Sequence, residues 1–565
     1  MGGAMNRHIS ITSVSLVVIA AALVVLAAVP AERDRVRSAI KNVDFHANVG
    51  QQARERPWDP DALLALAAAW TPYYGPKLPD VKAYRPLFKL KPDWAAAYLL
   101  LGYGMVSAVP LDQPRELAAS GQRTYYAGTQ FTRRQRQEAA TTARTVLQEA
   151  RALDPTNAAP DYLLAYLALA EHRDDDALGL LRSAMRKNHW SIGERETCIA
   201  RYKANARRMP PLEAAMFARV CTFVPRKSLR DLARVVTGMA VLAERGGDAK
   251  RAIFLRESVM HLGELMMAEG YTSIEVFDGR AVWAIGSSEP LTPAESAAAT
   301  KGLPKPKPRE SGERTQPWNL ALRKARLDKT VRYLRAHGRA ELAERIVSFG
   351  RAYPARQDLL SRVVGRDAAE VTILLRLMLG FRQALFALAA AMILAAVCGL
   401  ASLALVVLRR RPRPIIWARW KWALLIVACL VGPLAIAAAH AGWRPGRPLP
   451  GLSNDDYELD WLRPAPVMAL GLLVVSTLVV TWRLRRRAGM RNGVPGFGRH
   501  YVGTLAAVAV PLTAVVALGC LAVSVPLVLK ARERAQHYRT MIYHGELDYI
   551  GRQQVGEMPT NRPPQ

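Results

Sequence analysis

The sequence predicts an all-α protein in two parts, an irregular helical-repeat domain and a bundle of membrane-spanning α-helices. Its 565 residues are 51% hydrophobic and 22% charged, and the apolar residues concentrate in five long runs with the charges between them. In the region between the first two runs, apolar and small residues recur at helical spacing. One such set repeats after 34 residues, a period typical of stacked helix pairs.

The first apolar run extends from Ile9 to Val29. This length can cross a hydrocarbon core of ~30 Å at ~1.5 Å per residue. The small residues of Val29-Pro30-Ala31 also fit a signal-peptidase site, so a cleaved signal peptide is the alternative. The length favours an uncleaved N-terminal anchor over residues 1–31, and with either interpretation the following segment is exported.

Four further runs predict a bundle of four transmembrane helices over residues 381–530. Their interruptions are mostly single hydroxyl residues, which can bond to carbonyls of their own helix. The runs are Ala384 to Leu408, Trp422 to Ala441, Val467 to Trp482 and Val502 to Leu529.

The loops between these runs predict the orientation. The stretches from Arg409 to Lys421 and from Arg483 to Arg499 are basic and contain no acid, so both are predicted to be cytoplasmic and to lie near anionic lipid. The loop from Trp443 to Ala465 carries four acids and is predicted to face outwards. Residues from about 31 to 380 and the tail 531–565 are then extracytoplasmic, in a multi-pass protein of a bacterial-type plasma (inner) membrane.

The formal net charge of +31 raises the question of a nucleic-acid partner. Twelve basic residues lie in the two inner loops, six in each, where they set topology. The remainder is predicted to face away from the cytoplasm. The sequence therefore predicts a lipid bilayer as partner and no nucleic acid.

The 34-residue period resembles the tetratricopeptide repeat (TPR). The second TPR helix carries a small, a bulky and a small residue with proline soon after it, and the first helix has an aromatic residue followed by Leu-Gly. The first of these patterns occurs at Ala143, Leu147, Ala150 and Pro155 and recurs at Ala177, Leu181 and Ala184; the second occurs at Tyr98, Leu101 and Gly102.

This resemblance implies an irregular TPR-like α-solenoid over residues 32–285, with a concave surface that binds a protein. Inter-helix turns are expected at Gly247 and Gly338. The Pro/Lys/Ser-rich stretch 286–317 is predicted to be a flexible linker, and residues 318–380 a last helical pair and a membrane-proximal helix. The alternative is a non-repeat helical domain whose Ala-rich helices produce the 34-residue period by chance.

No motif of catalysis, cofactor binding or metal binding occurs, so no residue is predicted for any of these roles and no cofactor is expected. Asp174-Asp175-Asp176 could hold a hard cation, but acids at a helix N-terminus are the simpler interpretation. His537, His544, Glu546 and Asp548 could also bind a metal ion, but their spacing matches no familiar site.

Cys198 and Cys221 are the two cysteines of the predicted exported domain. In an oxidising compartment they could form a disulfide worth roughly 3 kcal/mol. The alternative is two buried thiols.

The sequence predicts a membrane-anchored scaffold or adaptor whose exported domain binds a protein partner in the cell envelope, and an enzyme is the less favoured reading. The alternative function is a subunit of an envelope glycan- or lipid-processing enzyme complex without a recognisable motif. Such a subunit should show acids or histidines converging in a cleft near the membrane.

Overall fold

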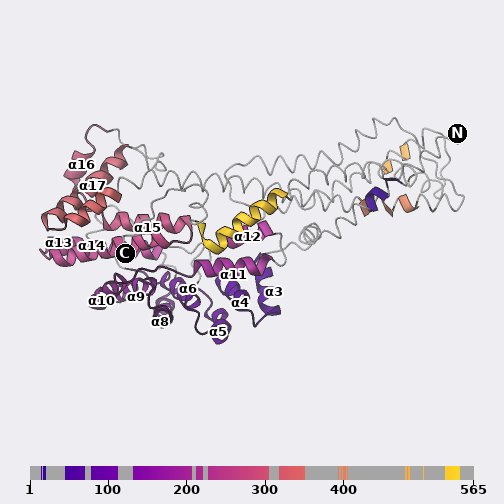
Figure 1. Cartoon of the computed structure of the whole chain (residues 1–565), viewed down its shortest axis with the longest axis horizontal. Coiled ribbons are helices and arrows are strands. Elements are labelled where there is room, and N and C mark those ends of the chain that lie inside the picture. Colours follow the sequence, from indigo (N-terminus) through magenta and orange to yellow (C-terminus); the bar gives the residue numbers. More distant parts are fainter. Residues whose placement is uncertain are drawn as a thin grey trace. The chain divides into compact units, whose positions relative to one another are not determined.

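The computed structural model of the chain describes residues 45–69, 78–111, 131–206, 211–220, 227–303, 317–349 and 529–546, together with isolated residues elsewhere. All regular elements within these ranges are helices (Figure 1). A single parallel bridge joins Asn157 to His189 in the same part of the chain. The predicted all-α class is confirmed.

The chain divides into two compact units. One contains residues 1–44, 206–214 and 367–537, and the other contains residues 45–205, 215–366 and 538–565. The second unit holds most of the described residues, and we call it the helical unit.

The described helices, in chain order, are α3 (Phe45–Glu55), α4 (Pro60–Ala69), α5 (Val81–Leu90), α6 (Ala95–Val106), α8 (Arg133–Leu153), α9 (Ala159–Ala170), α10 (Asp174–Ala184), α11 (Glu194–Ala206), α12 (Pro211–Val220), α13 (Lys227–Arg245), α14 (Ala249–Glu269), α15 (Ser273–Gly286), α16 (Pro293–Ala299) and α17 (Pro317–Ala336). Residues 340–349 and 529–544 are also helical.

Helices α6, α8, α9 and α10 pack mainly against their neighbours in sequence, α6 on α8, α8 on α9 and α9 on α10. Helix α8 starts with a capping box in which Thr132 and Gln135 bond to each other's backbone N–H groups, and it ends just before Pro155. Such caps satisfy N–H groups that have no partner within the helix. Local signals in the sequence therefore fix both ends of α8.

Helices α13, α14 and α15 form a second set (Figure 1). The predicted turn at Gly247 joins α13 to α14, and Gly247 has φ +80°, a conformation that glycine adopts without strain. Helices α14 and α15 approach closely at Gly263 and Gly279. A Cβ on Gly263 would lie 2.6 Å from the carbonyl oxygen of Gly279.

Apart from Asp161, helix α9 is apolar on all sides, and Ala159 to Leu169 are all buried. A helix of this kind needs cover on every face. Helices α8 and α10 cover part of it, and α13 packs on it as well. The Tyr162 hydroxyl donates to the Ser258 carbonyl of α14 over 2.9 Å.

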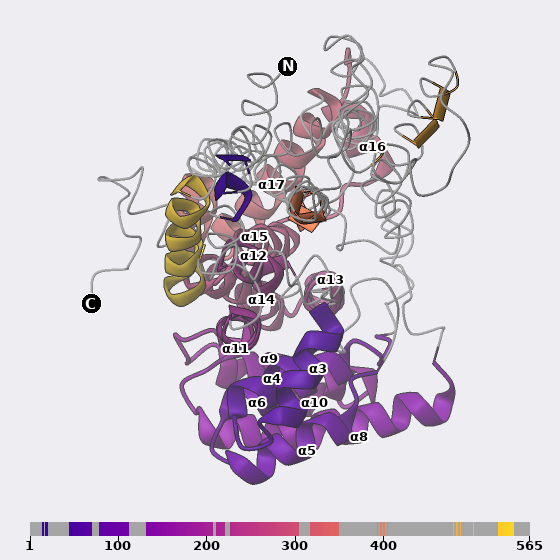
Figure 2. The ribbon, with the colours of Figure 1, turned by 90° about the vertical axis from the view of Figure 1, so that its right-hand side faces the viewer.

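The apolar side chains from Val49 to Val282 form one continuous core. In Figure 2, α13 and α14 lie above the group of α3 to α10. Helix α9 is therefore covered by other helices of the chain, and the expected concave surface stays a prediction.

Part of the predicted linker 286–317 is helical. Pro293–Ala299 forms α16, which begins with a capping box between Thr292 and Glu295 and packs on α17. The predicted turn at Gly338, with φ +74°, joins α17 to residues 340–349. Residues 304–316 lie outside the described residues, as does most of the insertion between Val109 and Phe131.

The five predicted membrane spans lie outside the described residues, apart from isolated positions. Within the part of the chain that the structure describes, no helix combines the length and the apolar character needed to cross a membrane.

A substitution at Gly102 tests the contact between α6 and α8. A Cβ at this position would lie 2.7 Å from both Cγ and Cδ2 of Leu147. We expect Gly102→Ala to lower the free energy of unfolding by about 1–3 kcal/mol because the core is already filled there. Gly179→Ala on α10 is the control, since no atom lies within 4 Å of its Cβ position, and it should be neutral or stabilising by up to ~1 kcal/mol. Thermal unfolding of both variants measures the difference, and equal melting temperatures would contradict the packing.

Candidate functional site

The loop between α10 and α11 meets the corner between α14 and α15, and polar side chains of both interact there, with Trp190 and Glu275 buried. We call this cluster the Trp190 junction, defined by His189, Trp190, Glu269, Tyr271 and Glu275. It joins segments that lie about 80 residues apart in the chain. The junction therefore connects the set of helices α6 to α10 with the set α13 to α15.

Two carboxylates organise the Trp190 junction. Glu269 Oε2 lies 2.6 Å from His189 Nδ1 and accepts the Trp190 backbone N–H over 3.0 Å. Glu275 accepts the Trp190 indole N–H over 2.6 Å with Oε1 and the Tyr271 backbone N–H over 2.9 Å with Oε2. Both oxygens of the buried Glu275 are therefore used for positioning.

The end of the C-terminal helix docks on this junction. The Tyr271 hydroxyl donates to the Ile542 carbonyl over 2.7 Å, and the Glu546 N–H donates to the Tyr271 carbonyl over 3.0 Å. The Glu546 carboxylate accepts the Ser273 N–H over 2.6 Å. This contact places a negative charge at the N-terminus of α15, where the helix dipole favours it. We call residues Tyr538–Glu546 the C-terminal segment.

Burial raises the pKa of Tyr271. The phenol therefore stays neutral and acts as a hydrogen-bond donor. Its acceptor is the backbone carbonyl of Ile542. The chemistry of this residue is that of a fixed anchor.

A second polar cluster centres on Asp161, which is fully buried on α9. Its Oδ2 lies 2.6 Å from Lys187 Nζ and accepts the Ser183 hydroxyl over 3.1 Å. Arg151 Nε on α8 lies 2.8 Å from Oδ1, as an ion pair rather than an aligned hydrogen bond. Asp161 thus connects α8, α9 and α10 at one point.

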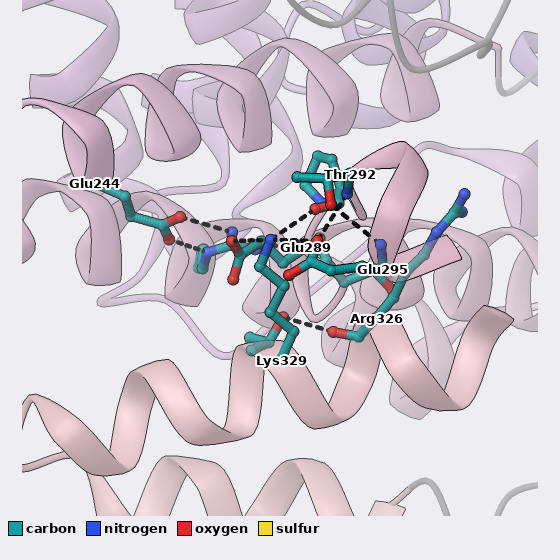
Figure 3. Close-up of polar contacts among 10 residues, drawn as sticks. Glu244, Glu289, Thr292, Glu295, Arg326 and Lys329 are labelled. Carbon is teal, nitrogen blue, oxygen red and sulfur yellow. Dashed lines mark hydrogen bonds and ion pairs between the residues drawn. The ribbon is translucent and has the colours of Figure 1, made fainter. Parts of the chain in front are cut away.

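A third cluster joins α13, α14, α16 and α17 (Figure 3). The buried Arg256 forms a two-pronged ion pair with Glu244, at 2.6 and 3.2 Å. Nearby, Lys329 Nζ lies 3.2 Å from Glu289 and 3.1 Å from Glu295. Burial raises the pKa of Glu289. These ion pairs join α13 to α14 and α16 to α17.

Apart from the exposed Pro155, the residues of the TPR-like pattern lie in the core or at helix contacts. Tyr98 is partly buried and stacks on Phe88, with ring centroids 4.1 Å apart. Gly102 lies against Leu147, and Pro155 follows the end of α8. The remaining pattern residues, all buried, are Leu101, Ala143, Ala150, Ala177, Leu181 and Ala184. These positions serve packing.

Cys198 is buried on α11, and its side chain lies beside Tyr271. Cys221 lies outside the described residues. The disulfide between them stays a prediction.

The acidic run Asp174-Asp175-Asp176 forms the first turn of α10, where its charges favour the helix dipole, and Asp176 also pairs with Arg173 at 2.6 Å. In the described ranges, no group of three or more His, Cys, Asp or Glu side chains has the geometry to hold a metal ion. Glu546 instead bonds to Ser273, and Asp548 lies outside the described residues.

The sequence-based reasoning did not identify Asp161, Trp190, Arg256 or Tyr271. No local pattern marks them, because their partners lie on other helices. Searches against protein-family models, curated proteins and solved structures find no match to this chain. Function is therefore inferred from the residues and their contacts.

Proposed function

We propose that the chain is a multi-pass membrane protein that presents the helical unit outside the cytoplasm as a scaffold or adaptor for a protein partner. The observation that carries this proposal is the docking of Ile542 and Glu546 on Tyr271 and Ser273. These residues come from the two sides of the predicted bundle 381–530. They can meet only if both segments lie in the same compartment.

The contact between Tyr271 and Ile542 constrains the number of membrane crossings between them. Four predicted spans separate Tyr271 from Ile542, and an even number of crossings returns the chain to its starting side. The contact requires only that both segments lie on the same side, and the positive-inside rule applied to the loops Arg409 to Lys421 and Arg483 to Arg499 assigns that side to the exterior. The two arguments are independent, since one uses loop charge and the other a tertiary contact.

Exposed apolar side chains in the predicted spans also support a lipid environment. Ile393, Val397 and Leu400 are 57%, 58% and 61% exposed and share one helical face by their spacing. In water such a face would be costly, whereas lipid would cover it. At the end of another span, Arg486 lies over the Trp482 ring, 4.5 Å from its centroid, an arrangement suited to a membrane interface.

The scaffold role rests on the helical array, which we interpret as TPR-like. Because α6 and α9 are covered, a partner would bind outward faces such as those of α8 and α17. Helix α17 exposes Arg323, Lys324 and Arg332, which suit an acidic partner. The alternative of an enzyme-complex subunit gains no specific support, since the buried carboxylates of Glu275 and Asp161 are engaged by protein donors.

Site-directed labelling in cells tests the location. We expect a small membrane-impermeant maleimide to label Ser348→Cys in the helical unit and His544→Cys in the C-terminal segment, both at exposed positions. The matched controls Arg413→Cys and Arg487→Cys, in the predicted inner loops, should be labelled only after the membrane is permeabilised. Labelling of a control in intact cells, or protection of either outer position, would refute the topology.

Cross-linking from Ser348→Cys then tests the scaffold role. One envelope protein captured in stoichiometric yield, and lost when Arg323, Lys324 and Arg332 are changed together to Glu, would support a protein partner. Capture of glycan or lipid alone would refute it and favour the enzyme-complex alternative.

A further inference from the structure

We propose that the C-terminal segment Tyr538–Glu546 is a latch whose docking on Tyr271 and Ser273 holds the surface loop of the Trp190 junction in place. The inference rests on the proposed topology, which places both in the same compartment. It goes beyond that function by giving the tail a conformational role.

The latch closes through a sharp reversal at Gly545. Its N–H donates to the Met541 carbonyl over 2.7 Å and ends the helix, and its φ is +93°. This left-handed conformation is strained for any residue with a Cβ. It turns Glu546 back so that its carboxylate reaches Ser273. A Cβ on Gly545 would also lie 3.3 Å from the Tyr271 carbonyl oxygen.

The apolar side of the latch is small. Tyr538, Met541 and Ile542 are buried, and Tyr543 meets Tyr202 edge to face, with ring centroids 6.3 Å apart. A contact of this size can open locally without unfolding the helical unit. Local opening of this segment is the motion that the latch requires.

The latch contacts continue to the surface through a chain of hydrogen bonds. Tyr271, which holds Ile542 and Glu546, donates its N–H to Glu275. Glu275 in turn accepts from the indole of Trp190, and the preceding residue in the loop is the half-exposed His189, paired with Glu269. Release of the latch removes two of the bonds that hold Tyr271, so the 185–194 loop should loosen with it.

Hydrogen exchange on the full-length chain in detergent or nanodiscs tests the coupling. We expect Gly545→Ala to raise exchange about tenfold, corresponding to ~1.4 kcal/mol, in peptides covering residues 270–276 and 185–194. Tyr271→Phe removes the hydroxyl that bonds to Ile542 and interacts with Cys198, keeps the ring, and should raise exchange in the same peptides by a smaller factor. His544→Ala, at the exposed neighbouring position, is the control and should change neither peptide.

Exchange in α8 to α10 shows whether a variant has simply unfolded. If Gly545→Ala raises exchange there as well, the coupling is judged from Tyr271→Phe alone, by whether exchange rises in residues 270–276 and 185–194. A rise confined to residues 538–546 would show that the segment docks without coupling and would overturn the latch. Cysteine labelling at residue 544 separates the two proposals: labelling from outside without coupling refutes the latch alone, whereas a cytoplasmic tail refutes both.

Discussion

Replacing Arg256 with methionine is expected to destabilise the helical unit by about 3–5 kcal/mol. Arg256 is fully buried, and its Nε and Nη2 pair with the carboxylate of Glu244, which is also buried. Its Nη1 donates to the carbonyls of Gly286 and Ser288 over 3.1 and 3.2 Å. Methionine fills much of the space but leaves a buried carboxylate without its cation and two carbonyls without a donor.

Urea unfolding of the solubilised chain, read by pulse proteolysis, measures this loss. Arg251→Met is the matched control, because Arg251 is exposed on the same helix, and it should change stability by no more than about 0.5 kcal/mol. The double variant Arg256→Met, Glu244→Leu should recover most of the loss, since it removes both charges together. A double variant as unstable as the single one would assign the effect to packing alone.

Arg256 also shows why part of the fold escapes sequence reasoning. In the segment Ala249–Glu269, arginines and glutamates recur among apolar residues, so Arg256 looks like one more solvated charge. Its partner Glu244 lies on the preceding helix, and Gly286 lies at the end of the following one. Only the packing of three helices distinguishes Arg256 from the exposed Arg251.

Features with a local cause could be predicted. The turns at Gly247 and Gly338 follow from glycine between two helical patterns. The almost entirely apolar sequence of helix α9 predicts that other elements cover it on all sides. That signal argues against an open concave surface at α9. The contact of Tyr271 with Ile542 has no such signal, since 271 residues separate the two.

Asp161 gives the second large expected effect. We expect Asp161→Ala to lower the free energy of unfolding by about 3 kcal/mol, because it leaves Lys187, which is mostly buried, without its carboxylate. Arg151 is less affected, since its side chain is 42% exposed and can turn to water. Asp175→Ala, in the exposed first turn of α10, is the control and should cost less than about 1 kcal/mol.

The conservative variant Asp161→Asn separates charge from shape. Asparagine keeps an oxygen that can accept the Ser183 hydroxyl but loses the ion pairs to Lys187 and Arg151, so most of the 3 kcal/mol should still be lost. Adding Lys187→Met to Asp161→Asn should then restore stability, because no buried charge remains without a partner. Full stability of Asp161→Asn alone would mean that hydrogen bonding, rather than charge, joins α8, α9 and α10. Helix α10 leads directly into the loop that contains Trp190. Either result therefore also shows how much the contacts of Asp161 stabilise the Trp190 junction.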